Sequence, residues 1–173
     1  MRIITEGDLR FSFPKEWSII KFDDCNFYRH RIERCQETKA VDILAWSGEI
    51  LYMIEAKDFR RERIKNQPRI TGGELAIEVT QKVSDTISGI FGAYRWKNEE
   101  LHDFYKVLFP KAKTKIQIIL LLEEYRPQEK AQYFKLRRSN LLKIMKQHMK
   151  FLNVRSFIYS KNDLPDSLGW NVT

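Results

Sequence analysis

Two neighbouring segments, Ala40–Trp46 and Ile50–Phe59, constrain the fold of this chain more than any other part. Both are rich in apolar and β-branched residues, as buried strands are. Ser47-Gly48-Glu49 separates them, and Gly48 can adopt the positive φ that a tight turn requires. The pattern predicts two antiparallel strands joined in a hairpin.

Three charged residues interrupt these apolar strands. Asp42 lies in the first strand, and Glu55 and Lys57 lie in the second. Because strand side chains alternate between faces, Glu55 and Lys57 share a face. A turn near Gly48 places Asp42 opposite Glu55, with their Cβ atoms about 4.5–5.5 Å apart. Two facing carboxylates repel and lose solvation, and a hard cation such as Mg²⁺ offsets both costs. We therefore expect a metal site with a lysine beside it.

Asp42 followed by Glu55-Ala56-Lys57 resembles the motif of the PD-(D/E)xK nuclease superfamily, although Val41 stands where the motif has proline. The resemblance implies an α/β fold of the restriction-endonuclease-like type, with a mixed β-sheet flanked by helices. It also implies Mg²⁺ (or Mn²⁺) bound by Asp42, Glu55 and the Ala56 carbonyl. Lys57 would be the catalytic lysine.

The same resemblance suggests supporting residues on two helices. The superfamily's first helix commonly supplies a glutamate, for which Glu33 is one candidate and Glu16 another. The helix after the motif often carries Gln or Lys near the site, and Gln81 and Lys82 could serve there. Glu78 lies near the polar side of that helix, so we expect it on an exposed face rather than at a metal.

The rest of the chain alternates between further strands and helices, as expected for one domain over residues 1–173. Periodicity predicts strands at Leu9–Phe13, Thr114–Glu124 and Asn153–Tyr159, and helices at Glu74–Trp96, after Asn98, and from Gln128 to about Leu152. Residues 17–22 and 27–32 fit a strand or a short helix. Arg60–Gly73 reads as a polar loop, and the tail from Ser160 as irregular.

Basic residues dominate the charge, with a net charge of +8 and a pI near 9.5, which favours contact with polyanions. The loop after Lys57 is expected to contact nucleic-acid phosphates, with DNA favoured. Its candidate residues are Arg60, Arg61, Arg63, Lys65 and Arg69. The long helix near the C-terminus adds further cations, whose spacing suggests more than one face and hence an ordinary solvated surface. They are Lys135, Arg137, Arg138, Lys143, Lys146 and Lys150.

No stretch approaches the ~18 apolar residues that a membrane helix needs, and the N-terminal residues lack a signal-peptide core. We expect a cytoplasmic protein that does not contact a membrane, with Cys25 and Cys35 reduced. A homodimer, which many members of the superfamily form to cut both strands, remains open.

The function predicted from these residues is metal-dependent hydrolysis of phosphodiester bonds. One alternative is a catalytically inactive nucleic-acid-binding module of the same fold. Another is an interaction protein with a merely basic surface, in which the three charged residues form a solvated ion-pair ladder.

Overall fold

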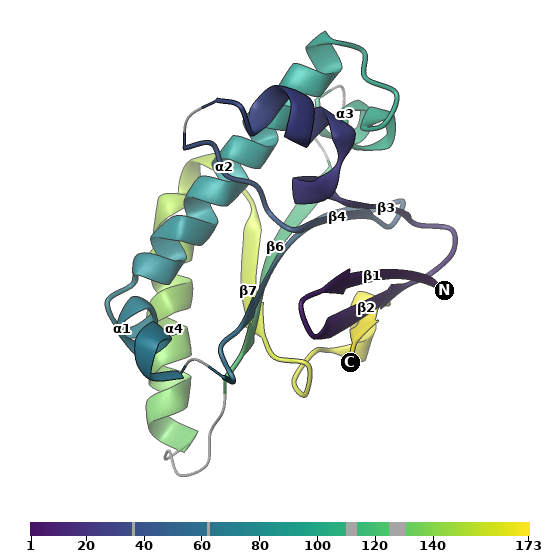
Figure 1. The fold of residues 1–173 in the computed structure, drawn as a ribbon. Coiled ribbons are helices and arrows are strands. Elements are labelled where there is room, and N and C mark those ends of the chain that lie inside the picture. The colour runs from purple at the N-terminus through teal and green to yellow at the C-terminus, as the bar shows by residue number, and fades with distance from the viewer. Residues whose placement is uncertain (36, 62, 110–113, 125–130) are drawn as a thin grey trace.

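A mixed β-sheet forms the centre of the molecule. The computed structural model describes residues 1–35, 37–61, 63–109, 114–124 and 131–173. Within these residues the central sheet has the strand order β3-β4-β5-β6-β7 (Figure 1). Its strands are β3 (Ser18–Lys21), β4 (Ile43–Trp46), β5 (Ile50–Asp58), β6 (Lys115–Glu123) and β7 (Arg155–Tyr159). Strands β3, β4 and β5 pair antiparallel, whereas β5, β6 and β7 pair parallel.

The predicted hairpin is confirmed, including its register. Ile43 pairs with Ile54 and Trp46 pairs with Leu51, and Gly48 has a φ of 94° in the turn. The first strand begins at Ile43 rather than at residue 40. The residues before it bond elsewhere, because the Val41 N–H donates to Thr86 Oγ1 at 3.0 Å on a neighbouring helix.

Helices cover one face of the sheet. The helix α2 (Glu74–Arg95) packs Val79 and Val83 into the same core as Met53 and Leu120 of the sheet. Helix α4 (Ala131–His148) lies alongside α2, and α3 (His102–Leu108) follows the end of α2 (Figure 1). Gly89 allows α2 to approach the chain before β4 closely, because a Cβ atom there would lie 2.6 Å from Ile32 Cδ1.

A second, smaller sheet covers the opposite face (Figure 1). It consists of β1 (Arg2–Glu6), β2 (Leu9–Phe13) and β8 (Asn171–Val172), all antiparallel. An aromatic cluster joins it to the central sheet, with Trp17 stacked on Tyr52 at 5.5 Å between ring centroids. The predicted class, an α/β chain with a mixed sheet flanked by helices, is confirmed in this form.

Two predictions about local structure are wrong, and one strand was not predicted. The stretch predicted as a polar loop contains α1 (Arg63–Thr71), with Pro68 inside the helix. Pro68 cannot donate a helical hydrogen bond, and Ile70 in the same helix is buried. Gly73, with a φ of 81°, separates α1 from α2. The tail is not irregular throughout, because Asn171–Val172 pairs with β2. The N-terminal strand β1 was not predicted.

Each of the two stretches that fitted either a strand or a short helix has one of these structures. Residues 28–32 form a short helical turn, and residues 18–21 form a strand. The start of the predicted C-terminal helix, residues 128–130, lies outside the described residues. No described helix is long and apolar enough to cross a membrane. Cys25 and Cys35 are both free thiols.

Candidate active site

The three charged residues of the hairpin meet on the face of the sheet that α2 covers. Asp42 directly precedes β4, and the register that pairs Ile43 with Ile54 continues to place Asp42 opposite Glu55. Asp42 is 5% exposed and Glu55 is fully buried. The predicted juxtaposition of two carboxylates is therefore observed, and both have lost most of their contact with solvent.

A backbone contact fixes the Asp42 carboxylate against β5. Asp42 Oδ2 accepts a hydrogen bond of 2.7 Å from the Ala56 N–H. The N–H and C=O of one strand residue point the same way along the hydrogen-bonding direction. The Ala56 carbonyl is therefore directed towards Asp42 and could supply a third oxygen donor at the site.

Two ammonium groups neutralise the carboxylate pair. Lys57 Nζ lies 2.8 Å from Glu55 Oε1, and Lys82 Nζ lies 2.7 Å from the same oxygen. Lys82 Nζ also lies 3.5 Å from Asp42 Oδ1. The other carboxylate oxygen, Glu55 Oε2, is buried and has no hydrogen-bond partner among the described residues.

Burial makes the ionised carboxylates costly. It raises the pKa of Glu55 to about 7, and the charge of Asp42 adds to that rise against the opposing effect of Lys57 and Lys82. Burial also raises the pKa of Asp42, whereas Lys82 and the Ala56 N–H lower it. Desolvation therefore outweighs the attraction of the two lysines at both carboxylates.

Glu78 on α2 belongs to the site, contrary to the expectation of an exposed face. Glu78 Oε1 lies 3.1 Å from Lys57 Nζ, and the Arg69 guanidinium of α1 donates to Glu78 Oε2. Burial opposes ionisation of Glu78, yet Lys57 and Arg69 outweigh it and hold the Glu78 pKa below its usual value. Lys57 therefore bridges one carboxylate on β5 and one on α2.

Asp23 is a further acidic residue near the site that the sequence did not single out. It lies in the short turn Phe22–Asp24, which is tied to the site by a 2.8 Å hydrogen bond from the Phe22 N–H to the Asp42 carbonyl. Asp23 Oδ1 is buried without a described hydrogen-bond partner. Burial raises the Asp23 pKa to about 6, and the Asp42 charge contributes. The only local signal was an acidic pair directly after a strand.

Other predicted residues lie apart from the carboxylate pair. Glu33 and Gln81 are exposed, and no described contact joins either to Asp42 or Glu55. Of the three supporting candidates, Lys82 alone contacts the pair.

Most of the basic residues predicted to contact phosphate form ion pairs within the chain. Arg60 binds Asp58 through Nε at 2.8 Å and through its terminal nitrogen at 2.5 Å. Arg61 pairs with Asp8 at 2.9 Å while remaining largely exposed. Arg69 binds Glu78 as described above. Lys65 is exposed, and the side chain of Arg63 lies outside the described residues.

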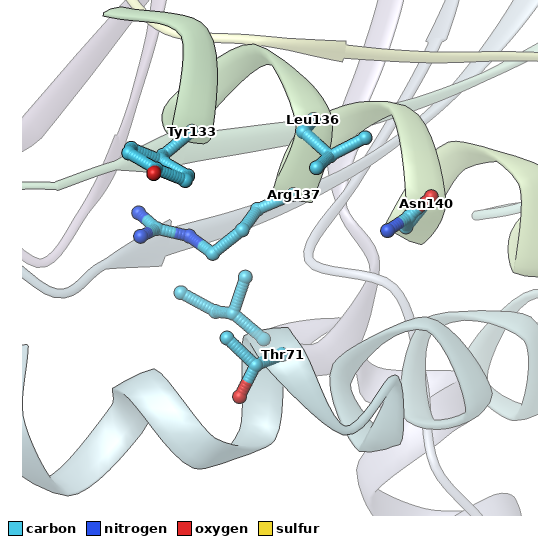
Figure 2. A pocket seen from close by; sticks show the side chains of 6 residues that line it. Thr71, Tyr133, Leu136, Arg137 and Asn140 are labelled. Atoms are coloured by element: carbon cyan, nitrogen blue, oxygen red, sulfur yellow. The ribbon is translucent and has the colours of Figure 1, made fainter. Parts of the chain in front are cut away.

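A ready-made metal cage is absent from the described part of the chain. No three His, Cys, Asp or Glu side chains among those residues are grouped to hold an ion. The candidate donor set is the Asp42 and Glu55 carboxylates with the Ala56 carbonyl. The pocket between α1 and α4, about 260 Å³ in volume, is a separate feature lined without any acidic residue (Figure 2).

Comparison with known proteins gives one weak similarity. No protein-family model matches the chain, and no solved structure matches it. The chain is 24% identical over 150 residues to the cysteine–tRNA ligase of Neisseria meningitidis serogroup A. That match covers 71% of this chain and 21% of the ligase, so the chain spans about a fifth of the ligase's length. A similarity of this extent assigns no family.

Proposed function

We propose that this chain is a divalent-metal-dependent nuclease of the PD-(D/E)xK type, which hydrolyses phosphodiester bonds with DNA as the favoured substrate. The observation that carries the proposal is the buried pair of opposed carboxylates, Asp42 and Glu55, with Lys57 in contact with Glu55. An exposed ion-pair ladder would not bury both acids. The restriction-endonuclease-like fold is part of the same proposal, supported by the mixed sheet and the position of the motif on it.

The residues at the site suit Mg²⁺ or Mn²⁺. Their donors are oxygen atoms, which hard cations prefer, and Glu55 Oε2 has no described hydrogen-bond partner. A bound divalent ion would supply an activated water and polarise the scissile phosphate.

Each side chain then has a distinct task. Asp42, Glu55 and the Ala56 carbonyl would hold the ion. Lys57, kept in place by Glu55 and Glu78, would orient the attacking water and stabilise negative charge that develops on the phosphate.

A cleavage assay across substrates tests the proposal. The purified protein is incubated with duplex DNA, single-stranded DNA, single-stranded RNA and a tRNA transcript, in Mg²⁺, Mn²⁺ or EDTA. The tRNA is included because of the similarity to a tRNA ligase. We expect cleavage that requires the divalent ion and that Asp42→Asn abolishes. If no substrate is cut, or if Asp42→Asn cuts at the unaltered rate, the proposal is wrong.

A catalytically inactive nucleic-acid-binding module is the second candidate. It is favoured by the position of Lys82, which already neutralises both carboxylates. This candidate predicts salt-dependent binding without cleavage in any divalent ion. It also predicts that Mn²⁺ leaves the free energy of unfolding unchanged, because nothing binds between the acids.

A further inference from the structure

The exposed face of α4 carries a row of lysines. Lys135, Lys143 and Lys146 on α4, and Lys150 in the 3-10 turn that follows it (Lys150–Leu152), are all exposed. At 3.6 residues per turn the three lysines on α4 fall within about a quarter of the helix circumference, and the four together extend over ~22 Å. No acidic residue occurs between Ala131 and Lys150. We call these four residues the α4 lysine row.

The structure thereby changes the expectation that these basic residues lie on several faces. Two arginines of α4, Arg137 and Arg138, lie outside the row and account for that expectation. Arg138 is 9% exposed, and it donates to the Leu122 carbonyl at 2.6 Å and to Asp163 Oδ2 at 3.0 Å. Arg137 lies 3.4 Å from Glu124. Once these inward residues are set aside, the remaining cations share one face.

A groove at the end of the row gathers three cations. It has a volume of about 490 Å³ and lies where α4 meets the start of β7, bordered by Lys146, Lys150 and Arg155. None of the three forms an ion pair with a residue that the structure describes. Ser156 also lines the groove, and its hydroxyl is buried with no described hydrogen-bond partner. Exposed cations without carboxylate partners are groups that bind phosphate oxygens.

We infer that the α4 lysine row and this groove bind the sugar-phosphate backbone of a nucleic acid. Over ~22 Å a DNA duplex presents about 13 phosphate charges, enough to face every cation of the row and groove. Lysines contact phosphate as point charges, so binding here is independent of base sequence. Lys146, Lys150 and Arg155 supply the positive charge in the groove.

The groove lies at the opposite end of the sheet from the candidate active site. Arg155 begins β7 and pairs with Gln117 near the start of β6, whereas Glu55 and Lys57 lie near the end of the parallel strand β5. The groove therefore contacts the nucleic acid away from the bond to be cut. This role rests on the proposed function, but its test requires binding and no cleavage.

A matched pair of variants tests the inference. The first replaces Lys143, Lys146, Lys150 and Arg155 by Gln. The control replaces four exposed basic residues elsewhere, Lys15, Lys39, Lys97 and Arg34, by Gln. Each variant lowers the net charge from +8 to +4, so the two differ only in where charge is lost. Circular dichroism melting confirms that both fold.

Binding is measured by fluorescence anisotropy with a labelled DNA duplex in EDTA, at several salt concentrations. We expect the first variant to lose about 3.6 from the slope of log affinity against log salt, at 0.9 for each of four phosphate contacts. The control should lose much less. Equal losses in both variants, or no loss in the first, would overturn the inference. The unaltered protein is also tested with phosphatidylserine vesicles. If it binds them more strongly than DNA, and the first variant loses this binding, the inference is overturned in favour of a membrane surface.

The same proteins separate this inference from the proposed function. Both variants retain Asp42, Glu55 and Lys57. If the unaltered protein binds DNA through the row but cuts nothing in Mn²⁺, the proposed function fails and the inference stands. If it cuts DNA and the first variant binds as the unaltered protein does, the inference alone fails.

Discussion

Replacing Glu55 with Gln should stabilise the metal-free protein while it removes activity. Glu55 is fully buried, and burial together with Asp42 raises its pKa to about 7 from the usual 4.5. This difference corresponds to about 3 kcal/mol at 1.36 kcal/mol per pKa unit. Gln keeps the shape of the side chain and removes the charge, so it avoids that cost.

The substitution also removes a charged partner of Lys57 and Lys82, but the stability lost in this way is limited. Lys57 retains Glu78 at 3.1 Å, and Lys82 retains Asp42 at 3.5 Å, so neither ammonium is left without a carboxylate. We therefore expect Glu55→Gln to raise the free energy of unfolding at pH 8 in EDTA by about 1–3 kcal/mol, the upper value being the full ionisation cost.

The sign of the pH dependence follows from the raised pKa. Below pH 4.5 Glu55 is protonated in both the folded and the unfolded state, and the variant has no advantage. Between pH 4.5 and about 7 the unfolded state loses its proton first, so the unaltered protein loses stability relative to the variant as pH rises. Above pH 7 the difference is constant.

Urea unfolding followed by circular dichroism, at pH 4.5 and pH 8 in EDTA, measures this difference. Mn²⁺ should offset this difference, because it should stabilise the unaltered protein by about 2.7 kcal/mol at 100 times its Kd and should not stabilise the variant. Glu49→Gln, at an exposed position, is the control and should change little. A Glu55→Gln variant that is less stable than the unaltered protein at pH 8 in EDTA would show that the buried Glu55 carboxylate does not destabilise the folded state.

Three further substitutions probe the surroundings of the pair. Asp23→Asn should weaken Mn²⁺ affinity by roughly tenfold in calorimetry, in the range for residues around metal ligands, and an unchanged affinity would exclude Asp23 from the site. Glu78→Gln should lower kcat by about tenfold and leave KM and Mn²⁺ affinity unchanged, because it weakens the contact that positions Lys57. If Glu78→Gln lowers kcat further in a protein that already carries Lys57→Met, Glu78 acts other than through Lys57. Thr86→Val removes the acceptor of the Val41 N–H at 3.0 Å and should cost about 1–3 kcal/mol in urea unfolding, so an unchanged midpoint would contradict the role of that bond.

The sequence predicted the hairpin and the opposed carboxylates because both depend on local information. A turn at Gly48 fixes which residues face one another, so Asp42 and Glu55 could be paired without knowledge of the rest of the fold. Helix α2 was predicted for a similar reason, since its apolar residues recur at helical spacing.

Features that depend on distant parts of the chain were missed. Glu78 was expected on a solvated helix face, because its contacts come from distant residues, Lys57 on β5 and Arg69 on α1. Helix α1 was not predicted because Pro68 lies inside it, and a proline commonly ends a helix. Strand β8 is two residues long and exists only because β2, near the other end of the chain, pairs with it.

Asp42 and Glu55 are proposed to hold a divalent ion beside a catalytic Lys57. The most direct test measures Mn²⁺ binding by calorimetry and DNA cleavage on the same samples of the unaltered protein, Asp42→Asn and Lys57→Met. We expect Lys57→Met to bind Mn²⁺ without cutting DNA, and Asp42→Asn to do neither. Cleavage by Lys57→Met at the unaltered rate, or Mn²⁺ binding that survives Asp42→Asn undiminished, would contradict the proposed function.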